Sequence, residues 1–107
     1  MKLALGSVKE VTHETLVFGR QMGATHVVIH TPQISDDRLG YYDYPDLLRL
    51  KGQVEESGLE IAAIENAPYN WYDKVLFGLP GRDQQIENWC TTLKNMGRAG
   101  IPILGYH

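Results

Sequence analysis

Residues 23–30 read Gly23-Ala24-Thr25-His26-Val27-Val28-Ile29-His30, and this stretch decides the fold because its pattern occurs three times. In each copy a glycine ends an amphipathic segment and a short apolar run follows. The other copies are Gly58-Leu59-Glu60-Ile61-Ala62-Ala63-Ile64-Glu65 and Gly100-Ile101-Pro102-Ile103-Leu104-Gly105-Tyr106-His107. Glycine accepts the left-handed backbone that ends a helix, and short, largely apolar runs are typical of buried parallel strands. The repeat therefore predicts helices that end at these glycines and lead into parallel strands.

Working outward from these glycines gives the whole element order. With an initial strand in Lys2-Leu3-Ala4-Leu5, strands are predicted near residues 2–7, 25–31, 60–66 and 101–106. Helices are predicted from Thr12, a suitable N-cap, to about residue 22, after Asp43, and from Arg82 with Asp83 in its first turn. The side chains expected on their core faces are Thr15, Phe18 and Met22, then Leu47, Leu50 and Val54, then Ile86, Trp89, Cys90, Leu93 and Met96.

This order, β-α-β-α-β-α-β, predicts an α/β fold with parallel strands joined by right-handed crossovers. An open doubly wound sheet and a (β/α)8 TIM barrel both accept it. The first strand is followed by Gly6-Ser7-Val8-Lys9 and not by a Rossmann-type glycine-rich turn. The chain has 107 residues, whereas a whole barrel needs roughly 250. We therefore expect residues 1–107 to form a single partial domain, the N-terminal half of a TIM barrel, with the open four-stranded sheet as the alternative.

Charge and composition argue against several classes of function. Ten basic and 13 acidic side chains give a net charge of -3, whereas a nucleic-acid-binding surface normally needs a basic excess. No apolar run approaches the roughly 18 residues of a membrane span, and the first apolar segment is too short for a signal peptide. The single cysteine, Cys90, fits a reducing compartment. We expect a cytoplasmic protein without nucleic-acid or membrane partners.

Polar side chains stand at the predicted carboxyl ends of three strands. His30, Glu65 and His107 each lie seven residues after the glycine of their repeat, so we expect them at equivalent heights on one rim. Ligands bind at this edge in both architectures, and imidazole and carboxylate groups can ligate a metal or transfer protons. The alternative is that these side chains simply face solvent in loops.

Other candidates also have structural alternatives. Arg82 could hold a substrate carboxylate with both arms of its guanidinium, or pair with a neighbouring acidic residue. The aromatic loop 68–74 could cover a ligand, contact another subunit or fold on its own side chains. His13 is expected in a solvated first turn and His26 at the amino end of a strand, and Cys90 is expected in the core. The sequence contains no HExxH, CxxC or EF-hand spacing, no phosphate-binding glycine loop and no nucleophile elbow.

The second half of the chain resembles one enzyme family. The residues that carry the resemblance are Ile64-Glu65-Asn66-Ala67-Pro68, Gly78-Leu79-Pro80-Gly81-Arg82-Asp83, Ile86-Glu87-Asn88-Trp89 and Thr92-Leu93-Lys94-Asn95-Met96-Gly97-Arg98-Ala99-Gly100-Ile101. This run is similar to the mannonate dehydratase family, in which a strand ends in Glu-Ser-Val-Pro and a Gly-Leu-Pro-x-Arg-Asp turn follows. Ile-Glu-Asn-Tyr then opens a helix that Leu-Arg-Asn-Leu-x-x-Ala-Gly-Ile closes. The likeness is strongest over residues 58–107 and is colinear but weaker over 1–57.

The resemblance implies a xylose-isomerase-like TIM barrel and a lyase that removes water from D-mannonate to give 2-dehydro-3-deoxy-D-gluconate in hexuronate (glucuronate) catabolism. It implies a divalent metal, Mn²⁺ or Fe²⁺, with ligands beyond residue 107. Glu65, Tyr106 and His107 are carried over from its strand-end motifs. With His30 and Arg82 they make up the predicted substrate-binding set for a sugar acid, and no metal ligand is assigned within the chain. We also expect the full-length protein to be a homo-oligomer.

The chain departs from the family at two strand ends. Gly105-Tyr106-His107 stands where the family reads Cys-Tyr-Asn, and Asn66-Ala67 where it reads Ser-Val. A histidine in place of asparagine changes the donors and acceptors available to a sugar acid. Two other functions stay open, a related sugar isomerase or epimerase and a non-catalytic half-barrel that self-associates through its sheet edges. As a fragment, the chain is expected to be inactive on its own.

Overall fold

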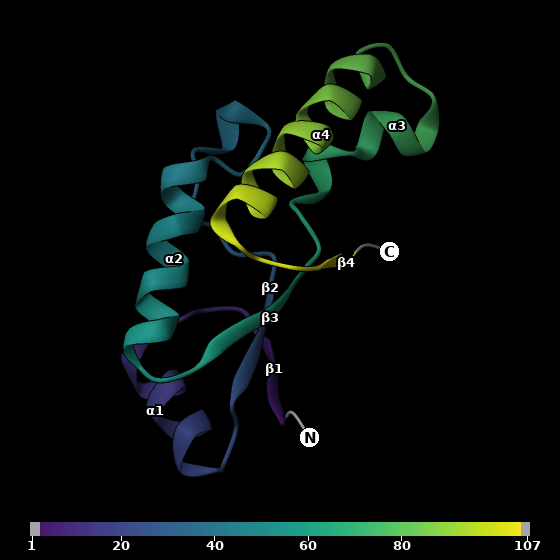
Figure 1. Ribbon diagram of the computed structural model, residues 1–107. Helices are drawn as coiled ribbons and strands as arrows, with labels where there is room; N and C mark the ends of the chain where they lie inside the picture. The colour runs from purple at the N-terminus through teal and green to yellow at the C-terminus, as the bar shows by residue number, and fades with distance from the viewer. Residues whose placement is uncertain (1–2, 106–107) are drawn as a thin grey trace.

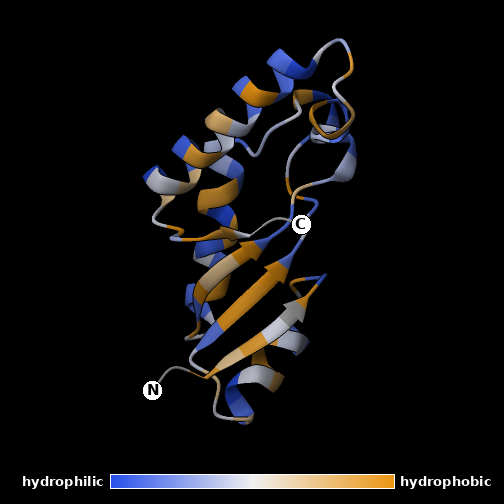
Figure 2. Ribbon diagram, turned by 90° about the vertical axis from the view of Figure 1, so that its right-hand side faces the viewer, coloured by the Kyte–Doolittle hydropathy of each residue, from blue (hydrophilic) through white to orange (hydrophobic). Residues whose placement is uncertain are grey.

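The computed structural model describes residues 3–105, in which four strands form one sheet and the main helices lie on one side of it (Figure 1, Figure 2). The strands are β1 (Ala4–Val8), β2 (His26–His30), β3 (Glu60–Glu65) and β4 (Leu104–Gly105). The helices are α1 (His13–Gln21), α2 (Tyr44–Glu56), α3 (Asp73–Phe77) and α4 (Arg82–Ala99), with short 3-10 helices η1 (Asp37–Leu39) and η2 (Tyr69–Trp71). The predicted order is confirmed, and α3 is an addition within the predicted loop 67–81.

The order of the strands decides between the two architectures. The sheet runs β1-β2-β3-β4, and every neighbouring pair is parallel. Because each right-handed crossover advances in the same direction, α1, α2 and α4 all fall on one face of the sheet (Figure 1). A doubly wound sheet reverses its strand order and carries helices on both faces. The described residues therefore form part of a (β/α)8 barrel, as predicted.

The core lies between the sheet and these helices. On β2, Val27 and Ile29 are fully buried, whereas Val28 and His30 are only partly covered. Since successive side chains of a strand point to opposite faces, Val28 and His30 point to the face that the helices leave uncovered. The second helix behaves as predicted, because the buried residues of α2 are Leu47, Leu50 and Val54.

The first helix buries a different face from the predicted one. Phe18 and Met22 are 54% and 64% exposed, and the buried residues of α1 are Leu16 and Gly19. A Cβ atom added at Gly19 would lie only 2.9 Å from Cδ2 of Leu5 on β1. The absence of a side chain at Gly19 thus lets the helix approach the strand along this side, and that approach turns Phe18 outward.

The predicted core stripe of the third helix is confirmed only for Met96, which is buried, and Trp89, which packs against the core. On α4, Ile86 and Leu93 are 47% and 46% exposed, and Cys90 is exposed and not in the core. The residues that α4 buries are Gln85, Thr92, Met96 and Ala99. The two polar side chains accept hydrogen bonds from backbone N–H groups outside α4. Thr92 Oγ1 accepts the N–H of Tyr42 over 3.0 Å, and Gln85 Oε1 accepts the N–H of Lys74 over 3.0 Å. Their hydrogen bonds outweigh the apolar periodicity that the prediction followed.

Within residues 3–105, no helix has the length and apolar character needed to cross a membrane. The molecule measures 47 × 24 × 23 Å. Its long axis runs from α1 at one end to α3 and the beginning of α4 at the other (Figure 1, Figure 2).

Candidate functional site

His30 and Glu65 are the last residues of β2 and β3, and they are paired in the register of the parallel sheet. Residues paired in this way point to the same face of a sheet, so both side chains lie on the face that the helices leave uncovered. Both are half-buried. The prediction that these two residues stand at the same height at the carboxyl edge is confirmed, and this is the edge at which barrel enzymes bind ligands.

The fourth strand pairs with β3 in a register that differs from the predicted one. Glu65 pairs with Gly105 and not with His107, because β4 enters the sheet only at Leu104. The residues directly after Gly100 lie outside the strand, and Pro102 among them has no N–H to donate. The equal spacing from the three glycines therefore does not carry over to the fourth strand. Tyr106 and His107 themselves lie outside the described residues.

The residue after each paired strand end has an unusual backbone. Thr31 has φ 42° and Asn66 has φ 69°, and they are the two non-glycine residues with positive φ among residues 3–105. Each continues the hydrogen bonding of the sheet: the N–H of Thr31 donates to the carbonyl of Glu65, and the N–H of Asn66 to that of Gly105, both over 2.8 Å. A β-branched residue at positive φ is rare, and such strain is concentrated at functional sites.

These residues surround the His30 ring. Nδ1 of His30 lies 3.0 Å from Oγ1 of Thr31, and Nε2 lies 3.3 Å from Nδ2 of Asn66. Asn66 is 6% exposed, and its Oδ1 has no hydrogen-bond partner among the described residues. We refer to His30, Thr31, Glu65 and Asn66 together as the strand-end cluster. Its members come from two neighbouring strands and hold one another through both backbone and side chains.

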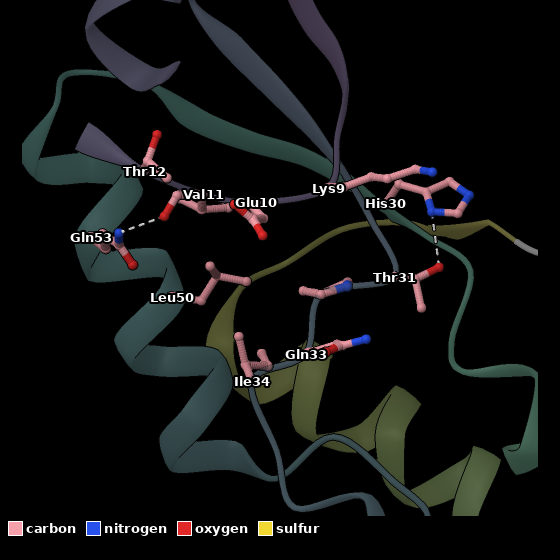
Figure 3. A pocket seen from close by; sticks show the side chains of 11 residues that line it. Lys9, Glu10, Val11, Thr12, His30, Thr31, Gln33, Ile34, Leu50 and Gln53 are labelled. Atoms are coloured by element: carbon pink, nitrogen blue, oxygen red, sulfur yellow. Dashed lines mark hydrogen bonds between the residues drawn. The ribbon is translucent and has the colours of Figure 1, made fainter. Parts of the chain in front are cut away.

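A cavity of about 750 Å³ borders this cluster between the loop after β1, the loop after β2 and α2 (Figure 3). In the view of Figure 3, Lys9 and His30 extend to one side of the cavity, and Gln53 and Leu50 of α2 lie on the other. We call it the Lys9 cavity. The residues that line it are Lys9, Glu10, Val11, Thr12, His30, Thr31, Pro32, Gln33, Ile34, Leu50 and Gln53. Hydroxyl, amide, imidazole and ammonium groups suit a small polar ligand more than an apolar one.

A second cavity, of about 640 Å³, shares residues 31–33 with the Lys9 cavity. Its polar wall is organised by Asp37, whose carboxylate accepts Nε1–H of Trp71 over 2.9 Å and Nδ2–H of Asn70 over 3.0 Å. We call it the Asp37 cavity. The residues that line it are Thr31, Pro32, Gln33, Ser35, Asp37, Pro68, Tyr69, Asn70 and Trp71. The predicted aromatic loop 68–74 thus both packs on its own side chains and borders a cavity, with Tyr69 54% exposed.

The other candidates lie away from the cluster. Arg82 begins α4, lines neither of these cavities, and donates from Nη1 to the carbonyl of Gly78 over 3.3 Å. Its role as a ligand for a substrate carboxylate stays a prediction. His13 is exposed in the first turn of α1, and His26 at the amino end of β2 pairs with Glu60 over 3.1 Å. Both placements agree with the sequence.

Sequence reasoning missed Lys9, Thr31 and Asn66. Lys9 directly follows β1, so its position at a strand end could have marked it. Asn66 stands directly after a strand, and asparagine is one of the residues that tolerate the left-handed region. Nothing in the sequence marks Thr31 as left-handed, because a β-branched residue normally avoids that conformation.

The described residues do not provide a metal site. Within residues 3–105, no group of three or more His, Cys, Asp or Glu side chains is placed to hold an ion together. Both ring nitrogens of His30 are within hydrogen-bond distance of neighbouring side chains. Both nitrogens are thus engaged within the strand-end cluster.

Known proteins that are similar to this chain identify its family. The family model described as D-mannonate dehydratase (UxuA) matches residues 3–107. The chain belongs to the mannonate dehydratase family. The crystal structure of mannonate dehydratase from Streptococcus suis serotype 2 is similar to this chain with a TM-score of 0.81 and 33% identity, over 99% of this chain and 30% of that one. The resemblance noted in the sequence and the barrel fold are thereby confirmed.

Curated mannonate dehydratases are related at the level of sequence as well. The protein from Streptococcus pneumoniae (strain 70585) is 45% identical over 62 residues, which is 58% of this chain and 16% of that protein. The protein from Brachyspira hyodysenteriae is 36% identical over 89 residues, 82% of this chain and 24% of that protein. The chain thus spans less than a third of the length of the mannonate dehydratases it matches, and it corresponds to one part of their fold.

Proposed function

We propose that this chain forms part of a hydro-lyase that removes water from D-mannonate and gives 2-dehydro-3-deoxy-D-gluconate. The observation that carries the proposal is the family match over residues 3–107, together with a solved mannonate dehydratase that superposes on 99% of the chain. In this proposal the reaction belongs to hexuronate (glucuronate) catabolism and the protein works in the cytoplasm. The 107 residues alone are expected to be inactive.

The proposed reaction gives the strand-end cluster a role in binding the substrate. Removal of water from a sugar acid needs a base for the proton next to the carboxylate and an acid for the departing hydroxide. Glu65 and His30 sit side by side on the uncovered face, where Glu65 can contact a hydroxyl group of the sugar acid and the His30 ring can line the site. We propose these two residues as part of the substrate site, together with Tyr106 and His107, which lie outside the described residues.

A divalent metal, Mn²⁺ or Fe²⁺, is part of the proposal. Because the described residues provide no group of ligands, the side chains that hold the metal are proposed to lie outside residues 3–105. The metal would supply stabilisation of negative charge on the reacting acid. The role of this chain is then to bind and orient the substrate.

Self-association is also part of the proposal. Large apolar side chains are exposed at the end of the molecule formed by α3 and the beginning of α4, namely Val75, Leu76, Phe77, Leu79 and Ile86. Such exposed apolar side chains are a common feature of subunit contacts. Light scattering on the complete protein should give a homo-oligomer, and a monomer at all concentrations would contradict this part of the proposal.

The decisive experiment is an assay of the complete protein on D-mannonate with added Mn²⁺, in which the 2-keto product is measured. Formation of this acid supports the dehydratase. An isomer of the substrate without loss of water would instead identify a sugar isomerase or epimerase. Absence of any product, with a discrete assembly of the chain, would favour the non-catalytic half-barrel.

Two variants of the same strand test the assignment of the site. Glu65 ends β3 at the carboxyl edge, and Glu60 begins it at the opposite edge. We expect Glu65→Gln to lower kcat/KM by about ten- to a hundredfold, the effect of losing a charged hydrogen bond. Glu60→Gln should leave kcat/KM unchanged. Equal activities for the two variants would remove Glu65 from the site.

A further inference from the structure

The contacts of the His30 ring define a directed chain of hydrogen bonds. The amide nitrogen of Asn66, 3.3 Å from Nε2, can only donate, so Nε2 accepts and carries no proton. The proton of the neutral ring is then on Nδ1, which donates to Oγ1 of Thr31 over 3.0 Å. The Thr31 hydroxyl accepts from His30 and keeps its own hydrogen for another acceptor. Asn66 therefore determines, through His30, that Thr31 is a donor.

The Thr31 hydroxyl stands where a ligand can reach it. Thr31 lines both the Lys9 cavity and the Asp37 cavity. The charged residues that line the Lys9 cavity are Lys9 and Glu10, and in Figure 3 Lys9 and Thr31 lie on the same side while Glu10 lies nearer to Val11. A hydroxyl donor beside a cation suits an anionic oxygen. The Asp37 cavity is lined by one carboxylate and by no basic residue, whereas Lys9 balances Glu10 in the Lys9 cavity, so an acid group is repelled less in the Lys9 cavity.

The backbone of these residues supports a role beyond folding. Thr31 is a β-branched residue at φ 42°, and Asn66 is 6% exposed at φ 69° with an unpartnered Oδ1 among the described residues. Each of these features is unfavourable for stability, and the two residues meet at one imidazole ring. Strained backbone that persists in this way is typical of ligand-binding sites.

We propose that the Thr31 hydroxyl donates a hydrogen bond to a carboxylate oxygen of the bound sugar acid, and that Asn66 is the positioning residue that aims it through His30. Lys9 supplies the neighbouring positive charge. This inference rests on the proposed function for the identity of the ligand. The tautomer of His30 does not depend on that function, and it provides a separate test.

The first test measures the tautomer by long-range ¹H–¹⁵N NMR on the complete protein with ¹⁵N-labelled histidine. The signals of His30 are assigned by their loss in His30→Gln. We expect His30 to be protonated on Nδ1. His26 is an internal reference, because its Nε2 lies 3.1 Å from the Glu60 carboxylate and its Nδ1 lies 2.6 Å from the Thr25 hydroxyl, so it should be protonated on Nε2. If His30 is also protonated on Nε2, the proposal is wrong.

Variants of Asn66 test which residue sets the tautomer. Asn66→Asp replaces the donor by an acceptor and should move the proton of His30 to Nε2. Asn66→Gly removes the amide and keeps a residue that accepts positive φ, and it should also shift His30 toward the Nε2 form. Neither change should alter the signals of His26. An unchanged His30 in Asn66→Gly would exclude Asn66 as the positioning residue.

The second test measures binding of D-mannonate and of D-mannitol, which has the same carbon chain without the carboxylate. Thr31→Val keeps the β-branched shape and removes the hydroxyl, and Thr31→Ser keeps the hydroxyl. We expect Thr31→Val to weaken binding of D-mannonate by about ten- to a hundredfold, with binding of D-mannitol unchanged and Thr31→Ser close to the wild type. Undiminished binding of D-mannonate to Thr31→Val would overturn the proposal.

The two tests separate this inference from the proposed function. A wild-type protein that binds D-mannonate without dehydrating it would remove the proposed function, while loss of binding in Thr31→Val would still support the assignment of Thr31. A wild-type protein that dehydrates D-mannonate but shows His30 protonated on Nε2 would keep the function and overturn the inference.

Discussion

Thr31 and Asn66 share a left-handed backbone conformation at the same position after neighbouring strands, and each donates its N–H to a carbonyl of the next strand over 2.8 Å. The hydrogen bonding of the sheet thus continues one residue past the paired ends of β2 and β3. The same two residues contact the two ring nitrogens of His30. The same backbone conformation, present at both residues, therefore places the two side chains that hold the imidazole at the carboxyl edge.

The backbone of Asn66 predicts an unusual order of stability among its variants. Asn66→Ala and Asn66→Gly both lose the amide, but only glycine accepts φ 69° without steric cost. We expect Asn66→Gly to be more stable than Asn66→Ala by about 1 kcal/mol in urea unfolding. Ala63→Gly, in the interior of β3, should have the opposite sign and lower the free energy of unfolding. A more stable Asn66→Ala would argue against the left-handed conformation.

The close approach of α1 to β1 predicts that Gly19→Ala lowers the stability of the fold, whereas Gly→Ala changes at two uncrowded helix positions raise it. A Cβ at Gly19 would lie 2.9 Å from Leu5 Cδ2, whereas nothing lies within 4 Å of one at Gly52 or Gly97. Gly52→Ala and Gly97→Ala should raise the free energy of unfolding by about 0.5–1 kcal/mol. Gly19→Ala should lower it by about 1 kcal/mol, because crowding against Leu5 exceeds the gain in helix propensity. Thermal unfolding of the three variants checks the pattern, and a stabilised Gly19→Ala would contradict it.

The buried hydrogen bond of Thr92 on α4 predicts a loss of stability when its hydroxyl is removed. Its Oγ1 accepts the N–H of Tyr42 in the core, whereas Oγ1 of Thr91 donates to the carbonyl of Glu87 within the helix. Thr92→Val leaves the N–H of Tyr42 without this acceptor and should lower the free energy of unfolding by about 1–3 kcal/mol. Thr91→Val, the matched control, should change it by less than about 0.5 kcal/mol. Equal effects would show that the Tyr42 contact is not specific.

Tyr42 predicts a dependence of stability on alkaline pH. The side chain is fully buried, its hydroxyl has no hydrogen-bond partner among the described residues, and burial raises the pKa of this hydroxyl well above its ordinary value of 10.0. Above pH 10 the unfolded chain loses this proton while the folded chain keeps it, so the folded state loses stability as the pH rises.

The loss attributable to Tyr42 should approach about 1.4 kcal/mol per pH unit above pH 10. Tyr42→Phe removes this dependence, so its stability relative to the wild type should increase above pH 10 and change little below pH 9. Urea unfolding at a series of pH values measures both. A constant difference between the two proteins across this range would show that Tyr42 ionises equally in the folded and unfolded states.

The repeat of glycines predicted the topology well because it reflects a local requirement. Gly23, Gly58 and Gly100 all have positive φ, as the ends of the helices demand, and the runs that follow enter the sheet. The buried faces of α1 and α4 differ from the predicted ones because they depend on tertiary contacts, which the hydrophobic periodicity of a helix does not reveal. On α1 the contact of Gly19 with Leu5 turns the helix, and on α4 the hydrogen bonds of Thr92 and Gln85 bring polar residues inward.

The candidate site could be predicted only in part. The pairing of His30 with Glu65 followed from equal spacing after two glycines, since both strands enter the sheet soon after them. The same spacing failed for the fourth strand, where the chain joins the sheet only at Leu104. The role of Asn66 could not be predicted, because its contact with His30 spans 36 positions in sequence and depends on an uncommon backbone conformation.

The sequential strand order also bears on how this part of the protein forms. Because the sheet runs β1-β2-β3-β4, each strand is paired only with strands that are adjacent in the chain, and the sheet has no long-range closure among the described residues. Each βα unit is then stabilised mainly by its neighbours, much as in a repeat protein, and most contacts join residues that are close in sequence. Such a chain can acquire structure unit by unit during synthesis, with β2 and β3, which have partners on both sides, exchanging their amide hydrogens most slowly.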